Sequence, residues 1–471
     1  MEDKDYRIIN VNMLEELDKL EENSIDNIIT DPPYELGFMG KSWDSTGIAF
    51  NKTTWEKCLR VLKPGGYLLA FGGSRTFYRI GVAIEDAGFE IRDTIMWMYG
   101  SGFPKSMNIG LAIDNKNGVE SPVIGVNEDI LKKQAKDLKE GHRKILDSFD
   151  AGAKERNNGF KTVSADIKEA QNEWKGWGTQ LKPAFEPVVI ARKPFKGSLL
   201  DNIDSYRVGG FNIDECRVPA NSEEYDIRHY TNEDCFQNLK PKESKFQVKP
   251  QSDGRFPSNV ILTYDEVDKD EVCGGFPVTG QGGNTGGYSY SGSTYSNSNI
   301  LNNIGDKPTG ISNYDDIGSA ARYYYCAKAN ARDRDEGLDE FIEKEMKVTS
   351  QYELPRDDGS IRNVPMRKNI HPTVKPTELM QYLVRLVSPK GATILDPFMG
   401  SGSTGKAVMY ENVDRNANYK FIGIEREKEY CEIAEARIVY AKGDRVVRSI
   451  NKETGEVEQK VERKIKQSKL F

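Results

Sequence analysis

The sequence predicts an α/β fold built on a doubly wound, mostly parallel sheet. Apolar runs of strand length alternate with helical stretches in both the N-terminal and the C-terminal parts of the chain. Near the C-terminus the apolar strand 393–396 runs directly into the glycine-rich turn 397–402 and then into a helix. This succession is typical of a sheet that binds a nucleotide-like ligand at the carboxyl ends of its strands.

The composition is that of a globular protein of two or three domains. With 471 residues, of which 37% are hydrophobic, the chain can bury a full core. We see no apolar run long enough to cross a membrane and no signal-like N-terminus, so we expect a cytoplasmic protein. The formal net charge of −7 means that binding to a polyanion would depend on local basic patches.

Cysteine and histidine give little sign of a metal site. The six cysteines are scattered without close pairs, and the chain has only three histidines. Four of the cysteines lie between residues 216 and 326, so an irregular zinc cluster there is an alternative to the metal-free protein that we expect.

Residues 1–104 are expected to form the first half of the sheet. We predict strands over 7–11, 24–30, 67–71 and 89–99, and helices over 13–20, 54–62 and 77–87. Gly88 follows the last of these helices as a C-cap glycine should, which supports the boundary there.

The second of these strands ends in Thr30-Asp31-Pro32-Pro33-Tyr34. Neither proline can donate to a ladder, so the strand must stop at Asp31 and a rigid, extended turn follows. The Asp31 carboxylate and the Pro32 carbonyl can each accept one N–H of an exocyclic amino group, while Tyr34 can stack on a flipped base. The same residues would also serve as an ordinary strand-ending turn with a stacked aromatic ring.

The regular alternation stops in the middle of the chain. Residues 105–179 are charged and poorly periodic, and we interpret them as an insertion. Residues 180–197 return to strand character, and we expect them to pair antiparallel with 89–99 as a hairpin at the sheet edge. Residues 198–365 are irregular again, and their Gly-, Ser- and Asn-rich run 274–314 cannot bury a core of its own.

One cluster in the longer insertion mixes aromatic rings with positive charge. Its members are Arg322, Tyr323, Tyr324, Tyr325, Lys328, Arg332 and Arg334. The mixture suits base stacking and phosphate contacts, but it also suits a half-buried strand.

Regular structure is expected again in residues 366–442. We predict helices over 378–387, 406–410 and 427–441, and strands over 393–396 and 420–424. Glu425 follows the last of these strands, where an acidic side chain is placed to accept both hydroxyls of a ribose. The remaining residues, 443–471, form a charged tail that we expect to be frayed.

Two motifs resemble those of a known enzyme family. The stretch from Asp31 to Tyr34, together with Asp396-Pro397-Phe398-Met399-Gly400-Ser401-Gly402, resembles the catalytic and cofactor motifs of amino-directed DNA methyltransferases. Their order, catalytic motif first and cofactor motif last, resembles the beta class of that family. The stretches 177–187, 254–260 and 322–329 are similar to its phage and prophage members.

The resemblance implies a Rossmann-like fold that uses S-adenosylmethionine, with an inserted DNA-recognition region in residues 198–365. It implies direct, site-specific transfer of the methyl group to the exocyclic amino group of a flipped base. N6 of adenine is favoured because Asp31, and not a serine, begins the catalytic motif. Residues 1–104 and 366–442 would form the two halves of the core, with 180–197 as its edge strand.

The resemblance also assigns the site residues. The catalytic residues are Asp31, Pro32, Pro33 and Tyr34. The cofactor-binding residues are Asn12, Asp31, Thr373, Lys375, Asp396, Pro397, Phe398, Gly400, Gly402, Thr404 and Glu425. Among them, Thr373 and Lys375 are assigned to the carboxylate of the methionine part. Asn12 replaces an aspartate that contacts the adenine in the family, so we expect it to supply a neutral hydrogen bond.

The partner that the resemblance implies is double-stranded DNA, with no metal and no membrane. The sequence leaves a homodimer and a cognate restriction nuclease open. Alternative functions are methylation of N4 of cytosine, of RNA or of a protein amide, and a non-catalytic DNA-binding protein that keeps the fold. The intact catalytic motif and glycine-rich turn favour an enzyme over the last of these.

Overall fold

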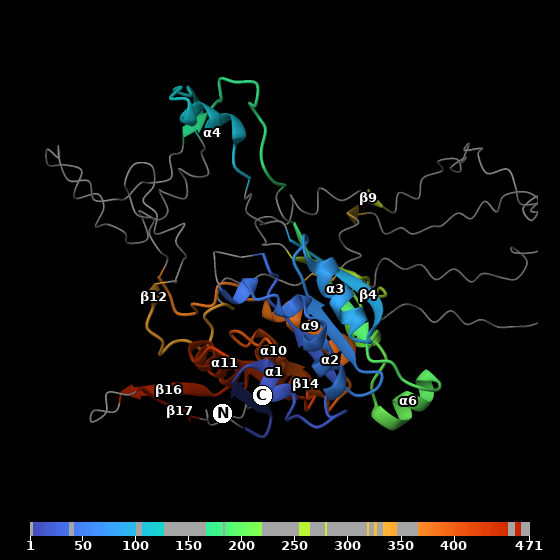
Figure 1. Ribbon diagram of the computed structural model, residues 1–471. Helices are drawn as coiled ribbons and strands as arrows, with labels where there is room; N and C mark the ends of the chain where they lie inside the picture. Colours follow the sequence, from blue (N-terminus) through green and yellow to red (C-terminus); the bar gives the residue numbers. More distant parts are fainter. Residues whose placement is uncertain are drawn as a thin grey trace, which may run out of the picture.

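A nine-stranded sheet runs through the molecule (Figure 1). In spatial order its strands are β1 Tyr6–Asn10, β15 Lys420–Glu425, β14 Thr393–Asp396, β2 Asn27–Thr30, β3 Tyr67–Phe71, β7 Phe185–Arg192, β4 Glu90–Tyr99, β8 Val260–Thr263 and β11 Tyr325–Cys326. β7 runs antiparallel to both of its neighbours, and the other neighbouring strands are parallel. This computed structural model describes residues 3–36, 42–99, 106–126, 166–181, 184–218, 254–263, 278–279, 318–319, 325–326, 333–345, 366–450 and 457–462.

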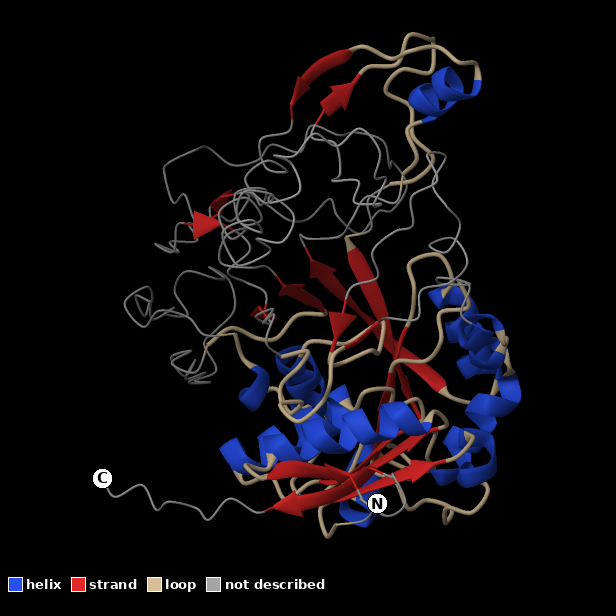
Figure 2. Cartoon of the chain, turned by 90° about the vertical axis from the view of Figure 1, so that its left-hand side faces the viewer, coloured by secondary structure: helices blue, strands red, loops and turns tan. Residues whose placement is uncertain are grey.

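Helices cover both faces of the sheet (Figure 2). One layer consists of α1 Met13–Leu17, α2 Lys52–Val61 and α3 Phe77–Asp86, and the other of α9 Thr377–Val387, α10 Ser403–Arg415 and α11 Lys428–Ala441. Successive strand residues point to opposite faces, so the buried Ile28 packs in the first layer and Ile29 in the second. The doubly wound, mostly parallel α/β fold predicted from the sequence is confirmed.

The two distant halves of the chain meet at β2, which pairs with β14 on one side and β3 on the other. The fully buried Asn27 locks this position. Its side-chain amide donates to the carbonyl of Val387 at 2.9 Å, and its oxygen accepts from the N–H of Tyr67 at 2.9 Å. Because the pairing is parallel, the end of β2 at Thr30 lies beside the end of β14 at Asp396.

The strand predicted for the sheet edge lies inside the sheet instead. β7 pairs antiparallel with β4 as expected, but it also pairs with β3, and the far side of β4 pairs with β8. β8 and β11 belong to residues 198–365, so that region adds strands to the core and does not lie wholly outside it. The physical reason is that β4 offers unpaired backbone groups along its far side, and β8 satisfies them.

Several other boundaries differ from the expected ones. α1 ends at Leu17 and β2 begins at Asn27, so both elements are shorter than predicted. α10 is longer and continues to Arg415, where Asn416 adopts a left-handed conformation and ends it. The tail was predicted to be frayed, but β16 Arg445–Ile450 and β17 Val457–Glu462 pair antiparallel in it. Each strand supplies hydrogen-bond partners for the backbone N–H and C=O groups of the other.

The described part of the shorter insertion, residues 106–126 and 166–179, stands away from the sheet in both views (Figures 1 and 2). The buried carboxylate of Asp114 holds it together, since its Oδ2 accepts from the N–H of Gln171 at 2.7 Å and from the hydroxyl of Ser121 at 3.1 Å. It contains α4 Ile109–Lys116, β5 Val123–Val126 and β6 Asp166–Lys168. The remaining short elements are η2 Ser42–Ser45, η3 Ile48–Phe50, α6 Leu199–Tyr206, η5 Asp214–Cys216, β9 Val278–Thr279, β10 Gly318–Ser319, β12 Lys344–Glu345 and β13 Met366–Arg367.

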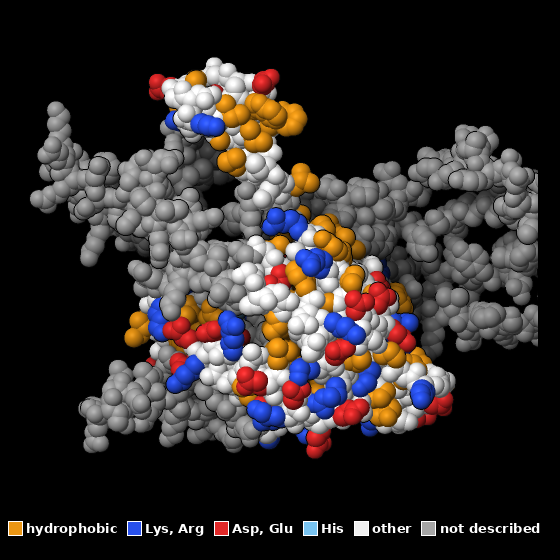
Figure 3. All heavy atoms as spheres, viewed as in Figure 1, with side chains coloured by type: hydrophobic (Ala, Val, Ile, Leu, Met, Phe, Trp, Pro, Cys, Tyr) orange, Lys and Arg blue, Asp and Glu red, His pale blue; other side chains and the backbone are white. Residues whose placement is uncertain are grey.

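The visible face of the core mixes basic and acidic side chains over its whole extent, so no patch of a single sign dominates that face (Figure 3).

Among the described residues, no helix combines the length and the hydropathy that a membrane span requires. The same part of the chain contains no group of three or more His, Cys, Asp or Glu side chains placed to hold a metal ion.

Candidate active site

A cavity of about 1230 Å³ opens at the carboxyl ends of the parallel strands. Three acidic side chains reach it from three neighbouring strands: Asp31 follows β2, Asp396 ends β14 and Glu425 ends β15. The carboxyl edge of such a sheet is where α/β folds bind their ligands. Every residue predicted for the site lines this cavity except Gly402.

Asp31 has one paired and one unpaired carboxylate oxygen. Its Oδ2 accepts a hydrogen bond from the Nζ of Lys375 at 2.6 Å. Its Oδ1 is buried and has no hydrogen-bond partner within the described part of the chain. An unsatisfied buried acceptor costs about 1–3 kcal/mol, so this oxygen is suited to an N–H donor that a ligand brings.

Lys375 is shared between two carboxylates. Besides Asp31, it lies 3.5 Å from Oε2 of Glu186, and only 8% of its side chain is exposed. The ammonium also lies 5.3 Å from the ring centre of Tyr34 and 5.1 Å from that of Phe71. Burial by itself would lower the pKa of Lys375, but the two carboxylates outweigh burial and raise it, so Lys375 is a fixed cation at neutral pH.

Glu186 orients Tyr34. The hydroxyl of Tyr34 donates to Oε2 of Glu186 at 2.7 Å, and the hydroxyl of Tyr99 donates to Oε1 at 3.4 Å. Burial, together with the charges of Asp31 and Glu186, raises the pKa of Tyr34 well above its ordinary value, so the phenol stays neutral. A neutral ring that is held at its far end is suited to stacking on a planar base.

The pairing of Lys375 differs from the contact expected for it with the cofactor, and that expected contact stays a prediction. The ammonium assigned to the carboxylate of the cofactor is engaged with Asp31 and Glu186. Glu186 reaches this ammonium from β7, which lies inside the sheet between β3 and β4. Thr373, assigned to the same carboxylate, lines the cavity, and its backbone carbonyl lies 2.6 Å from Nδ1 of His371.

Asp396 joins the two motifs. Its buried carboxylate accepts hydrogen bonds from the hydroxyls of Thr30 at 2.7 Å and Thr404 at 2.6 Å, and from the N–H of Phe398 at 3.2 Å. Burial raises the pKa of Asp396 to about 7 against the opposing effect of these hydrogen bonds, and the charge of Asp31 adds to the rise. The hydroxyl of Thr404, predicted to bind the cofactor, is therefore engaged in holding α10 to β14.

The glycine-rich turn presents Glu425 to the cavity. The N–H of Gly400 donates to Oε2 of Glu425 at 3.0 Å, and the N–H of Glu427 donates to Oε1 at 2.8 Å. Burial raises the pKa of Glu425, and these backbone donors oppose the rise. Gly400 has a φ of +53°, and a Cβ there would lie 2.7 Å from Nε2 of His371, so the turn requires glycine.

Gly402 has a packing role and does not line the cavity, so its predicted cofactor contact stays a prediction. Its φ is +77°, and a Cβ at this position would lie 2.8 Å from the Cβ of Ala434 on α11. The absence of a side chain therefore lets α10 begin close against α11. A motif glycine can serve helix packing as well as a ligand, and the sequence pattern alone does not separate the two.

Asn12 lines the cavity but already has a structural task. Its side-chain oxygen accepts from the N–H of Leu14 at 3.0 Å and caps the N-terminus of α1. Besides this capping oxygen, the side chain carries two N–H donors on its amide nitrogen.

Three residues of the site were not assigned to it from the sequence. Glu186 lies in the stretch 177–187, whose likeness to phage enzymes was the only available signal. His371 was a lone histidine, and Arg334 was attributed to a DNA-contacting cluster, yet both line the cavity. The other basic members of that cluster, including Arg332, lie outside the described residues.

The fold and the cavity define an α/β protein that can hold a nucleotide-like ligand beside a buried carboxylate. Residues 25–436 match the family model of the N6/N4 DNA methylases, and the chain therefore belongs to that family.

Two relatives share shorter stretches with the chain. The type II methyltransferase M.HpaI of Haemophilus parainfluenzae is 40% identical over 111 residues, which are 22% of this chain and 34% of that enzyme. The type II methyltransferase M2.DpnII of Streptococcus pneumoniae is 43% identical over 68 residues, which are 14% of this chain and 23% of that enzyme. The matches thus span about a third of the length of these relatives or less.

Two solved structures are similar over most of their length. The PvuII DNA methyltransferase, which is cytosine-N4-specific, is 13% identical with a TM-score of 0.37 and covers 92% of this chain and 86% of its own. The M1.HpyAVI–SAM complex is 16% identical with a TM-score of 0.34 and covers 92% of this chain and 98% of its own. With TM-scores this low, the fold is assigned from the strand order above and not from these neighbours.

Proposed function

We propose that this protein transfers a methyl group from S-adenosylmethionine to the exocyclic amino group of a base in double-stranded DNA, at N6 of adenine. The observation that carries the proposal is the carboxylate of Asp31, which lines a large cavity at the carboxyl edge of the sheet and whose buried Oδ1 has no hydrogen-bond partner among the described residues. Family membership supports methylation of DNA as the reaction.

The cavity suits the cofactor. Its volume of about 1230 Å³ exceeds the roughly 300–1,000 Å³ of ordinary ligand pockets, which leaves room for a nucleoside-type cofactor and a flipped base together. The oxygens of Glu425 each accept one backbone N–H and retain lone pairs for ribose hydroxyls. When bound, S-adenosylmethionine supplies an electrophilic methyl group on a sulfonium.

The catalytic residues act by positioning. Oδ1 of Asp31 and the carbonyl of Pro32 accept the two N–H groups of the amino nitrogen and turn its lone pair out of the base plane. Lys375 restrains Asp31 through Oδ2, so that only one oxygen serves the substrate. Transfer would form the nitrogen–methyl bond while the sulfur–methyl bond breaks and its electron pair stays on sulfur. Asp31 stabilises the positive charge that grows on the nitrogen, and the surplus N–H proton then leaves to solvent.

Tyr34 holds the flipped base. Stacking on an aromatic ring contributes about 1–3 kcal/mol per base, which offsets much of the few kcal/mol that flipping costs. The hydrogen bond from the Tyr34 hydroxyl to Glu186 fixes the ring before the base arrives, so less ordering remains to be done on binding.

Adenine is preferred to cytosine because the motif begins with Asp31, although both bases offer a two-donor amino group to this site. Target recognition would be carried by residues 198–365, whose β8 and β11 extend the sheet and so tie this region to the core. Because both relatives above are type II methyltransferases, we propose modification of specific sites in DNA.

One assay tests the proposal. Unmodified plasmid is incubated with the protein and S-adenosylmethionine, digested to nucleosides and examined by mass spectrometry, and the modified positions are mapped by modification-sensitive sequencing. N6-methyladenine at a defined sequence is expected. N4-methylcytosine alone would replace the proposed base, and an unmodified plasmid with methylated RNA or protein would overturn DNA as the substrate.

A further inference from the structure

The cavity needs a cation other than Lys375. The cofactor of the proposed function, on which this inference rests, carries a carboxylate on its methionine part, and Lys375 already serves Asp31 and Glu186. The other basic side chains that line the cavity are Arg75, Arg334, His371 and Arg426. A buried carboxylate requires one of them or an equivalent set of donors.

Three of these four side chains are poorly suited. His371 is neutral, because burial lowers its pKa to about 3, with a partial opposing effect of its hydrogen bond to Thr373. Arg426 lies 3.0 Å from the carboxylate of Glu427, and its side chain is 47% exposed. Arg75 is exposed to solvent, which would screen its charge.

Arg334 is partly buried and has hydrogen-bond donors that are not yet used. Its guanidinium donates to the carbonyl of His371, while its Nε is buried without a hydrogen-bond partner in the described part of the chain. No described carboxylate lies within ion-pair distance of it. Burial lowers its pKa to about 10, which leaves it charged at neutral pH.

Arg334 lies on the cofactor side of the cavity. Its partner His371 adjoins the glycine-rich turn, since a Cβ on Gly400 would lie 2.7 Å from His371 Nε2. The ring of His371 also packs against Tyr430 on α11, with ring centres 4.7 Å apart. The same turn donates to Glu425, the residue suited to the ribose.

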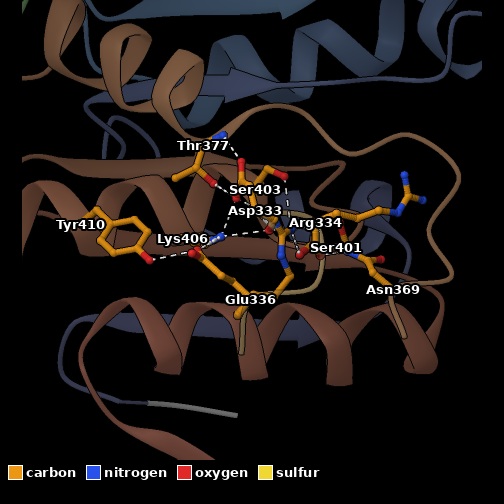
Figure 4. Close-up of polar contacts among 10 residues, drawn as sticks. Asp333, Arg334, Glu336, Asn369, Thr377, Ser401, Ser403, Lys406 and Tyr410 are labelled. Carbon is orange, nitrogen blue, oxygen red and sulfur yellow. Dashed lines mark hydrogen bonds and ion pairs between the residues drawn. The ribbon is translucent and has the colours of Figure 1, made fainter. Parts of the chain in front are cut away.

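A buried charge cluster fixes the backbone beneath Arg334 (Figure 4). Asp333 accepts from the N–H of Thr377, the first residue of α9, at 2.6 Å, and it pairs with the fully buried Lys406 of α10. Arg437 of α11, also fully buried, lies 3.6 Å from Oδ1 of Asp333. Figure 4 shows the side chain of Arg334 extending away from this cluster. The cluster residues bind one another and hold the segment in place, and the side chain of Arg334 is not engaged with them.

We propose that Arg334 binds the carboxylate of the methionine part of S-adenosylmethionine. A guanidinium can meet a carboxylate with two parallel N–H donors, and partial burial limits screening by water. Arg334 belongs to residues 198–365, so the region proposed for target recognition completes the cofactor site. Cofactor binding is then coupled to the docking of the segment 333–341, whose Leu338 and Phe341 are buried in the core.

The test compares two ligands that differ only in the carboxylate. The full-length protein is titrated calorimetrically with S-adenosylhomocysteine and with its decarboxylated form, which keeps the adenosine, the sulfur and the amine. Arg334→Met should bind S-adenosylhomocysteine about 10- to 100-fold more weakly, as expected for losing a charge-assisted contact. It should bind the decarboxylated ligand within about threefold of the wild type, which also shows that the cavity is intact.

Two further variants complete the design. Arg334→Gln keeps a donor for the carbonyl of His371 and guards against misfolding, and it should reproduce the selective loss. Arg367→Met removes a nearby cation that does not line the cavity and should leave both affinities unchanged. Equal weakening of both ligands, or no weakening, in both Arg334 variants would overturn the assignment, whereas a wild-type protein that binds neither ligand would overturn the proposed function itself.

Discussion

Lys375 and Asp31 are 344 positions apart in the sequence and form an ion pair of 2.6 Å in the structure. The pair joins the segment before α9 to the end of β2, and Glu186 on β7 completes it at 3.5 Å. Because Lys375 donates to Oδ2 of Asp31, the carboxylate is held at the cavity wall, and its buried Oδ1 has no partner among the described residues.

Lys375→Met should lower the rate of methyl transfer by about 100-fold or more, because Asp31 would lose its restraint and face Glu186 without a cation. S-Adenosylhomocysteine and its decarboxylated form should be affected to the same small extent. Single-turnover rates and calorimetric titration check this prediction. A loss of affinity confined to the carboxylate-bearing ligand would instead restore Lys375 as its partner.

Asp31→Asn should reduce kcat by about 100- to 1,000-fold, since a neutral amide stabilises the developing positive charge poorly. Binding of S-adenosylhomocysteine should stay within about threefold of the wild type, because Glu425 and the Gly400 turn are untouched. Calorimetric titration compares the affinity of Asp31→Asn with that of Gly400→Leu, a control variant in which the cofactor site itself is disrupted. If Asp31→Asn loses the ligand as completely as Gly400→Leu, catalysis and cofactor binding do not separate along the chain.

Asp396 should make the protein less stable as the pH rises toward 7. Its folded-state pKa is raised from 3.8 to about 7, so the folded state holds a proton that the unfolded state releases, and stability falls between about pH 4 and 7. Asp396→Asn lacks this titration. The urea midpoint of the variant minus that of the wild type should therefore increase as the pH rises from about 4 to about 7. A difference that stays constant over this range would contradict the raised pKa of Asp396.

Gly402→Ala should destabilise the protein by about 2–4 kcal/mol, through a positive φ and a clash with Ala434. The folded fraction should still bind S-adenosylhomocysteine within about threefold, since Gly402 does not line the cavity. Denaturant unfolding and calorimetry measure the two quantities. If the variant lost affinity for S-adenosylhomocysteine while its free energy of unfolding was unchanged, Gly402 would be part of the cofactor site.

The local chemistry of the two motifs could be read from the sequence. Pro32 and Pro33 end a strand wherever they occur, and Asp31 before them must lie at a strand end. A buried strand that runs into the Gly400 turn and a helix has few alternative geometries. For this reason the alternation of elements, the parallel sheet and the placing of Asp31, Asp396 and Glu425 at one edge were all predictable.

Tertiary structure alone decided which side chains meet. Lys375, Glu186 and Arg334 have no local feature that reveals their partners, because an ion pair depends on which strands become neighbours and not on spacing along the chain. β7 took an interior place in the sheet and brought Glu186 to Asp31, and the buried Asp333 cluster brought Arg334 to the cavity. The sequence therefore determined the reacting group, Asp31, through local backbone chemistry, whereas the charges that orient it and complete the cavity were set by long-range packing.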